Sequence, residues 1–200
     1  MELVMSDFTL GCGPAHRLEI TLRKADWQLA DVTKLTKNED LCRQIRSVLL
    51  GHAKITVMEH VIDLDKEPFC PEGLYSTGKG AEHRKGGKLI LTPGKIKLFL
   101  AEGQKNGGCL EGHKLREELV NQPVLNANAL DYYWAHQELI PEEWKGKVVY
   151  FWGTIYRDAR RNLFVRYLHR SGDRWVSGFR WLGGDFHGYR PAAVLASPAL

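Results

Sequence analysis

The last 44 residues of the chain, 157–200 (hereafter the tail), contain no Lys, Glu, Gln or Met. The first 156 residues contain 36 residues of these four types, so about ten would be expected in the tail at the same frequency. Arginine is not depleted, because eight of the fourteen arginines follow Tyr156. Two explanations compete: selection for an aromatic and guanidinium-rich surface, or a gene segment whose codons cannot encode the missing residues.

Other absences narrow the class of protein. No run of 18 apolar residues occurs, so we expect no membrane-spanning helix. The first 13 residues have no basic start followed by a long apolar stretch, so we expect no signal peptide and, by default, a cytoplasmic location. The four cysteines form no CxxC pair. We therefore expect buried free thiols in a reducing compartment at Cys12, Cys42, Cys70 and Cys109.

Sequence motifs of common enzymes are also missing. The chain has no HExxH and no GxSxG motif, and the segment 73–80 (GLYSTGKG) lacks the Ser or Thr that a phosphate-binding loop places after its lysine. We therefore expect no catalytic residues, no metal and no cofactor. One alternative stays open: His60, Asp63 and Asp65 place an imidazole and two carboxylates near a strand end, which would suit a metal-dependent enzyme.

Length and charge suggest one globular domain with an uneven charge distribution. We divide residues 1–200 into a scaffold (1–156), a variable ligand-binding region (157–190) and a closing segment (191–200). The scaffold carries 20 basic against 21 acidic residues, whereas the tail carries 8 arginines against 3 aspartates. Because of the positive excess in the tail, nucleic acid is an alternative partner. Arginines would then bind phosphates, and aromatic rings would stack on bases.

Hydrophobic periodicity predicts an α+β fold, with helices in the N-terminal two-thirds and an antiparallel sheet at the C-terminus. Helices are predicted over residues 38–50, 112–120 and 126–136, the first and last capped by Asn38 and Asn126, with a short helical turn at 141–144. Strands are predicted over 17–24, 54–62, 88–91, 95–100, 147–156, 162–170 and 174–182. We expect hairpins across 92–94 and 171–173, and loops over 63–87 and 183–190.

The predicted strands of the tail do not alternate cleanly between apolar and polar faces. Trp175, Ser177, Phe179 and Trp181 share one face of the last strand, so large aromatic groups and polar groups are mixed. Tyr, Trp and Arg dominate binding energies at interfaces, and Tyr, Ser, Gly and Asn dominate diversified paratopes. The alternative is a well-packed aromatic hairpin with solvated arginines.

The missing residue types favour diversification. When the adenines of Asn codons ending in a pyrimidine are randomised, fifteen amino acids arise, but Lys, Glu, Gln, Met and Trp do not. Four of these five are absent from the tail. The fifth, Trp, occurs in the tail only at Trp175 and Trp181, which we therefore expect to be fixed positions.

This pattern resembles the C-terminal variable region of proteins diversified by retroelements, in which a reverse transcriptase copies a template with errors at adenines. The segment 188–192 (GYRPA) is similar to the G-F-R-P-A ending of such proteins, and residues 124–156 resemble an uncharacterised microbial family with a variable tail. The resemblance implies a C-type lectin-like fold. It also implies a non-enzymatic protein that recognises a protein or another macromolecular ligand.

The predicted roles in the tail fall into two sets. Ligand contacts are expected at Tyr167, His169, Arg170, Ser171, Asp173, Ser177, Phe179, Arg180, Phe186, His187, Tyr189 and Arg190. Invariant support is expected from Leu163, Val165, Leu168, Trp175 and Trp181.

Overall fold

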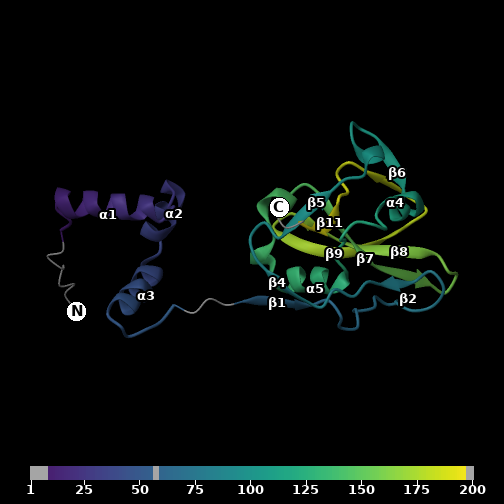
Figure 1. Ribbon diagram of the computed structural model, residues 1–200, viewed down its shortest axis with the longest axis horizontal. Helices are drawn as coiled ribbons and strands as arrows, with labels where there is room; N and C mark the ends of the chain where they lie inside the picture. The colour runs from purple at the N-terminus through teal and green to yellow at the C-terminus, as the bar shows by residue number, and fades with distance from the viewer. Residues whose placement is uncertain (1–8, 56–58, 197–200) are drawn as a thin grey trace. The chain divides into compact units, whose positions relative to one another are not determined.

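The computed structural model describes residues 9–55 and 59–196, and its contacts divide the chain into two compact units (Figure 1). Unit 1 comprises residues 1–58 and unit 2 residues 59–200, where the length of the chain had suggested one domain. The first eight residues of the segment used to predict the absence of a signal peptide, and the last four of the closing segment, lie outside the described residues.

Unit 1 is helical. It contains α1 (Cys12–Lys24), α2 (Leu29–Thr36) and α3 (Glu39–Leu49). The strand predicted over 17–24 is wrong, because Leu18 and Leu22 are also one helical turn apart and the Arg23–Glu19 ion pair (2.6 Å) bridges successive turns. The Asn38 cap is confirmed, since its Oδ1 accepts a hydrogen bond from the Leu41 N–H at 2.9 Å. None of the described residues of these helices is buried.

Unit 2 combines a mixed set of strands with two α-helices, which confirms an α+β architecture. The helices are α4 (Gly112–Glu118) and α5 (Ala127–Ala135), and three 3₁₀ turns cover Glu102–Gln104, Gln137–Leu139 and Glu142–Trp144. The early strands are β1 (His60–Asp63), β2 (Leu74–Tyr75), β3 (Glu82–His83), β4 (Lys88–Leu91), β5 (Ile96–Phe99) and β6 (Cys109–Glu111). The later strands are β7 (Val148–Asp158), β8 (Leu163–Ser171), β9 (Arg174–Trp181), β10 (Asp185–His187) and β11 (Ala192–Leu195).

The main sheet has the order β5-β11-β7-β8-β9, and β2 and β3 also pair with β7. All its pairs are antiparallel except β11 with β7. Figure 1 shows β7, β8 and β9 side by side, with α5 near them. The predicted β8–β9 hairpin is confirmed, with Ser171 paired to Arg174 across Gly172 and Asp173.

Three local predictions in unit 2 need correction. Residues 88–100 form two strands but no hairpin, because β4 pairs with β1 whereas β5 pairs with β11. The strand predicted over 54–62 begins at His60, and its residues 56–58 lie outside the described ones. The predicted loops 63–87 and 183–190 contain β2, β3 and β10. The partners of β2, β3 and β10 are remote in sequence, so local periodicity gave no signal for these three strands.

Strand β7 separates two hydrophobic clusters. Val149 and Phe151 belong to one cluster with Leu130 and Tyr133 of α5. Tyr150 and Trp152 face the other way and belong to a second cluster with Phe186. Because successive side chains of a strand point to opposite faces, β7 is apolar on both faces. All residues from Val149 to Tyr156 are buried.

Gly153 lets the segment before α5 cross β7 at close range. A Cβ at this position would lie 2.9 Å from main-chain atoms of Leu125 and Asn126. The Gly153 N–H donates to the Leu125 carbonyl at 2.8 Å, and the Gly153 carbonyl accepts from the Arg84 N–H at 2.7 Å. The β7–β8 register shifts between Tyr150 and Ile155, around this glycine. The close approach of the Leu125 and Asn126 main chain leaves no room for a side chain at position 153.

We predict that Gly153→Ala lowers the free energy of unfolding by about 1–3 kcal/mol, the usual cost of inserting a methyl group into packed backbone. Urea unfolding followed by tryptophan fluorescence measures this loss. The matched control is Gly13→Ala, because a Cβ at Gly13 meets no atom within 4 Å. Equal midpoints for Gly153→Ala and the wild type would contradict the proposed role.

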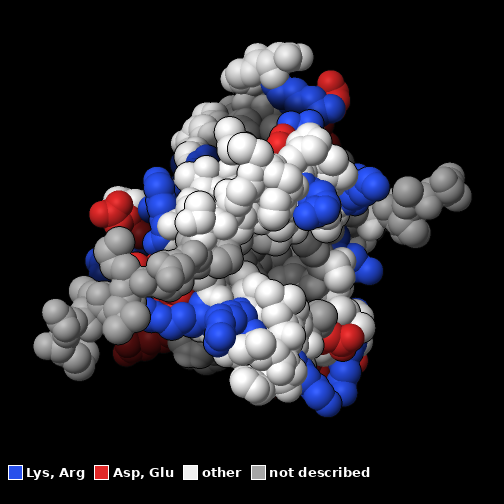
Figure 2. Space-filling model, turned by 90° about the vertical axis from the view of Figure 1, so that its left-hand side faces the viewer, with Lys and Arg blue, Asp and Glu red and all other residues white. Residues whose placement is uncertain are grey.

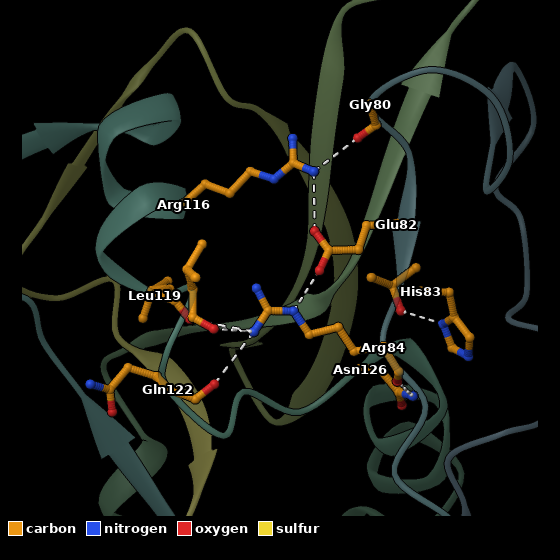
Figure 3. Close-up of polar contacts among 10 residues, drawn as sticks. Gly80, Glu82, His83, Arg84, Arg116, Leu119, Gln122 and Asn126 are labelled. Carbon is orange, nitrogen blue, oxygen red and sulfur yellow. Dashed lines mark hydrogen bonds and ion pairs between the residues drawn. The ribbon is translucent and has the colours of Figure 1, made fainter.

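A cluster of charged side chains joins β3 to α4 and to the segment that follows α4 (Figure 3). Glu82 accepts from Arg84 Nε at 2.5 Å and from Arg116 Nη2 at 3.1 Å. Arg84 also donates to the carbonyls of Leu119, Val120 and Gln122. Burial alone would raise the pKa of Glu82, but the hydrogen bonds from the two arginines outweigh it and hold that pKa below its ordinary value of 4.5.

We predict that Glu82→Gln makes the protein less stable at pH 6 and less sensitive to acid. A carboxylate whose pKa is lower in the folded state stabilises the fold above its unfolded pKa, and this contribution is lost as pH falls through about 4.5 toward the folded value. The expected loss at pH 6 is about 1–3 kcal/mol, because two arginines lose an ionised partner. Urea midpoints at pH 6 and pH 4 test this, with the exposed Glu102→Gln as control. Parallel acid profiles for Glu82→Gln and the wild type would rule it out.

Candidate functional site

The predicted contact positions lie almost entirely at the surface of unit 2. Eleven of the twelve are exposed or partly exposed, and Phe186 is the exception at 0%. Phe186 lies on β10, which pairs with β6, and its ring packs against Tyr150 and Trp152 at centroid distances of 4.9 and 5.1 Å. Its prediction as a ligand contact is therefore wrong: it is a core residue.

The predicted support positions are mostly buried. Val165, Leu168 and Trp175 are 0%, 0% and 5% exposed, and Leu163 is partly buried. Trp181 departs from the expectation, because it is 48% exposed. Its indole instead covers the turn after β9, where a Cβ on Gly183 would lie 2.1 Å from the ring. The tryptophan therefore shields backbone rather than filling the core.

The two faces of the β8–β9 hairpin divide the predicted contacts. Residues directly opposite in the register share a face, so Tyr167 and His169 of β8 lie with Gly178 and Val176 of β9, and Arg180 follows on that face. Arg170, Ser177 and Phe179 lie on the other face, where Phe179 meets Phe164 edge-on at 5.7 Å between ring centroids. Ser171 and Asp173 lie at the hairpin turn.

A pocket of about 160 Å³ opens beside Tyr167, and we call it the arginine pocket. Its lining residues are Val148, Tyr150, Tyr167, His169, Phe179, Arg180 and Arg190. Five of these seven are predicted contacts, drawn from β8, β9 and the loop after β10. The other two, Val148 and Tyr150, belong to β7. Neither was predicted from the sequence, because the expected contacts were confined to the tail, and only the β7–β8 register places Tyr150 opposite Tyr167.

The two arginines of the pocket have no acidic partner. Arg180 Nη2 and Arg190 Nη1 both donate to the main-chain carbonyl of Asp185, at 3.0 and 2.6 Å. Guanidinium groups that share one oxygen lie within about 6 Å of each other, a separation at which like charges repel by about 3 kcal/mol at an effective dielectric constant of 20. Among the described residues, neither arginine forms an ion pair with a carboxylate. The Nε atoms of both are buried, with no acceptor among these residues.

Aromatic rings form the rest of the pocket. The rings of Tyr150 and Tyr167 lie 5.2 Å apart, and Gly178 allows Tyr167 to cross β9 because a Cβ there would lie 2.7 Å from the phenol. Burial raises the pKa of Tyr150 although Arg190 and Arg180 act to lower it. Tyr150 therefore stays neutral at physiological pH and supplies no negative charge to the arginines.

The loop that carries His187, Tyr189 and Arg190 is held through its main chain. The buried Gln104 side chain donates from Nε2 to the carbonyls of Phe186, His187 and Arg190 at 3.2–3.3 Å. The Tyr189 carbonyl accepts from the Val148 N–H at 2.9 Å. The side chains stay at the surface, where the His187 and Tyr189 rings stack at 5.9 Å and Arg190 lies over Tyr189 at 4.9 Å. None of the contacts that hold this loop through its main chain requires a particular side chain at 187, 189 or 190.

We predict that Gln104→Ala loosens this loop. Three carbonyls lose one shared donor, and a buried cavity remains, so the expected loss in unfolding free energy is about 1–3 kcal/mol. Hydrogen exchange of the amides in 186–190 should accelerate more than that of β8 amides. The control is Gln44→Ala, on an exposed face of α3. Unchanged exchange in 186–190 would show that Gln104 does not hold the loop.

Arg166 is buried, and it lies inside the predicted variable region. Its side chain is 2% exposed and pairs with Asp131 of α5 at 2.8 Å. Its guanidinium also lies over the Phe69 ring at 5.2 Å. This arginine is therefore not one of the solvated arginines that the alternative of a well-packed aromatic hairpin would contain. The structure makes it part of the contact between the sheet and α5.

The residues of the alternative metal site are engaged elsewhere. His60 Nδ1 lies 2.8 Å from the Tyr132 hydroxyl. Asp65 accepts hydrogen bonds from the N–H groups of Gly86 and Gly87, both at 2.9 Å, and these bonds keep its pKa below the ordinary value. Over residues 9–55 and 59–196, no group of three or more His, Cys, Asp or Glu side chains could hold a metal ion. Asp63 borders a groove of about 680 Å³ that is lined mainly by apolar side chains of the 61–69 segment and α5.

Two general expectations concern the surface. The four cysteines are free but exposed, so the prediction of buried thiols is wrong. In the part of the chain that the structure describes, no helix is long and apolar enough to cross a membrane. On the face drawn in Figure 2, basic and acidic side chains are interspersed among uncharged ones.

No protein-family model, curated protein or solved structure matches the chain.

Proposed function

We propose that this protein is a non-enzymatic recognition protein whose C-terminal region displays a diversified ligand-binding surface. The observation that carries the proposal is the contrast between side chains and main chain in the loop after β10. There, His187, Tyr189 and Arg190 present partly exposed side chains, while Gln104 and β7 hold the backbone through carbonyl oxygens. Such a loop keeps its shape when its side chains change.

Burial in the hairpin supports the same proposal. The expected contacts Tyr167, His169 and Phe179 are at least partly exposed, whereas the expected support residues Val165, Leu168 and Trp175 are buried. A recognition surface needs rigid aromatic and guanidinium groups at exposed positions, backed by an unchanging core. The arginine pocket concentrates these groups in one place.

The order of elements in unit 2 supports a C-type lectin-like fold. Strand β5 pairs with the last strand, β11. The segment of chain between these two strands contains α4, α5 and the three-stranded meander β7-β8-β9. The meander then displays the variable side chains on a rigid sheet, as the resemblance to retroelement-diversified proteins implies. Unit 1 and the strands before β5 are additions to such a core.

The gene itself provides the main test. We expect a near-copy of the segment that encodes the tail, with AAC or AAT at the diversified positions, close to a reverse-transcriptase gene. Sibling proteins should differ at Tyr167, Phe179 and His187 while keeping Trp175 and Trp181. Sequencing the locus and its siblings reveals this. Lys, Glu or Gln at Tyr167, Phe179 or His187 in sibling copies would refute diversification through Asn codons.

A tolerance experiment tests the surface independently of the locus. Codons ending in a pyrimidine are randomised at Tyr167, His169, Phe179 and Tyr189 in one library, and at Val165, Leu168 and Trp175 in a control library. Most members of the first library should stay folded, as measured by protease resistance on a display platform, and few of the second. Equal survival in the two libraries would show that the exposed positions are not the replaceable ones.

A further inference from the structure

We propose that the arginine pocket binds a carboxylate, and that the ligand of this protein is a protein surface that presents an Asp or Glu side chain to Arg180 and Arg190. This inference rests on the proposed recognition function and names the chemistry of its ligand. Three features of the pocket favour a carboxylate: its charge, its unused donors and its size.

The charge of the pocket is uncompensated. Arg180 and Arg190 converge on the single carbonyl of Asp185, a neutral acceptor that leaves two adjacent positive charges. The seven lining residues include no acid, and Tyr150 remains protonated. An anion from outside would relieve the repulsion between the guanidinium groups as well as bind to them, so both effects favour its entry.

The two guanidinium groups also have unused hydrogen-bond donors. Each donates to the Asp185 carbonyl through one of its two Nη atoms, which leaves the other Nη atom for a ligand. A hydrogen bond from a guanidinium group to a carboxylate is about twice as strong as one between neutral groups. The planar guanidinium presents its donors in a fork that matches the two oxygens of a carboxylate. The phenols of Tyr150 and Tyr167 border the same space.

Size and surroundings favour a single side chain over a polyanion. A volume of about 160 Å³ accommodates one carboxyl group with its methylene stem rather than a nucleotide. The wall contributed by Val148 and the aromatic rings suits that apolar stem. The tail's three acids, Asp158, Asp173 and Asp185, interrupt its arginines, whereas a nucleic-acid groove needs a continuous basic track along the phosphates.

The test uses the full-length protein and peptides of defined charge. A displayed random peptide library is panned on the protein, and the selected peptides are resynthesised with Asp and Glu or with Asn and Gln at the same positions. Affinities are measured by titration calorimetry or interferometry for the wild type and for Arg180→Gln/Arg190→Gln. The matched control is Arg160→Gln/Arg161→Gln, which removes the same charge from two exposed arginines of the tail.

We expect the acidic peptides to bind at least tenfold more tightly than their amide forms. We also expect Arg180→Gln/Arg190→Gln to abolish this preference, and Arg160→Gln/Arg161→Gln to preserve it. Equal affinity for acidic and amide peptides would overturn the proposal. So would an equal loss in both double variants, which would indicate general charge attraction. A single-stranded oligonucleotide that binds through the pocket while the peptides do not would assign the site to nucleic acid instead.

Failure of this inference can be told apart from failure of the proposed function. If the libraries show a replaceable surface but no acidic peptide is preferred, the recognition function stands and the carboxylate site is rejected. If acidic peptides bind through the two arginines but siblings show no diversification, the pocket stands and the diversified surface is rejected. Siblings that carry other residues at 180 and 190 should lack the preference for acidic peptides.

Discussion

The burial of β7 on both faces is the constraint on which unit 2 depends. One face supports α5 through Val149 and Phe151, and the other supports β10 through Tyr150 and Trp152. Strands β2, β3, β8 and β11 all pair with it. Because a close-packed interior leaves little freedom to its neighbours, every element that borders the candidate site takes its position from this strand.

The arginine pocket illustrates this dependence. Strand β7 supplies Tyr150 and Val148 to its wall, and the main-chain bond from Val148 to Tyr189 fixes the loop that delivers Arg190. On the opposite side of the sheet, the buried Arg166–Asp131 pair joins β8 to α5. Such a pair is a modest source of stability but strongly disfavours arrangements that would leave either charge unpaired.

Local signals in the sequence predicted the parts of the fold whose partners are close in the chain. Asn38 and Asn126 cap helices because the cap bonds are made within three residues, and the β8–β9 hairpin closes over a short turn. Phe186 could not be assigned to the core from sequence, because β10 pairs with a strand more than seventy residues earlier. Composition pointed to the tail as the candidate site, but the register alone shows that Tyr150 lies opposite Tyr167 and that the predicted contacts occupy two faces.

A surface that varies must contribute few of the interactions that hold the protein together. Several such interactions in unit 2 use residues that precede the tail, namely Gly153, Glu82 with its two arginines, and Gln104. The tail also supplies core residues, among them Arg166, Trp175 and Phe186, so these positions are constrained by the fold. The loop 186–190, by contrast, is supported through its carbonyl oxygens, which every residue type provides. Even the two pocket arginines are held by the Asp185 carbonyl rather than by its carboxylate. A change of side chain at position 185 would therefore leave the bonds that orient the two arginines intact.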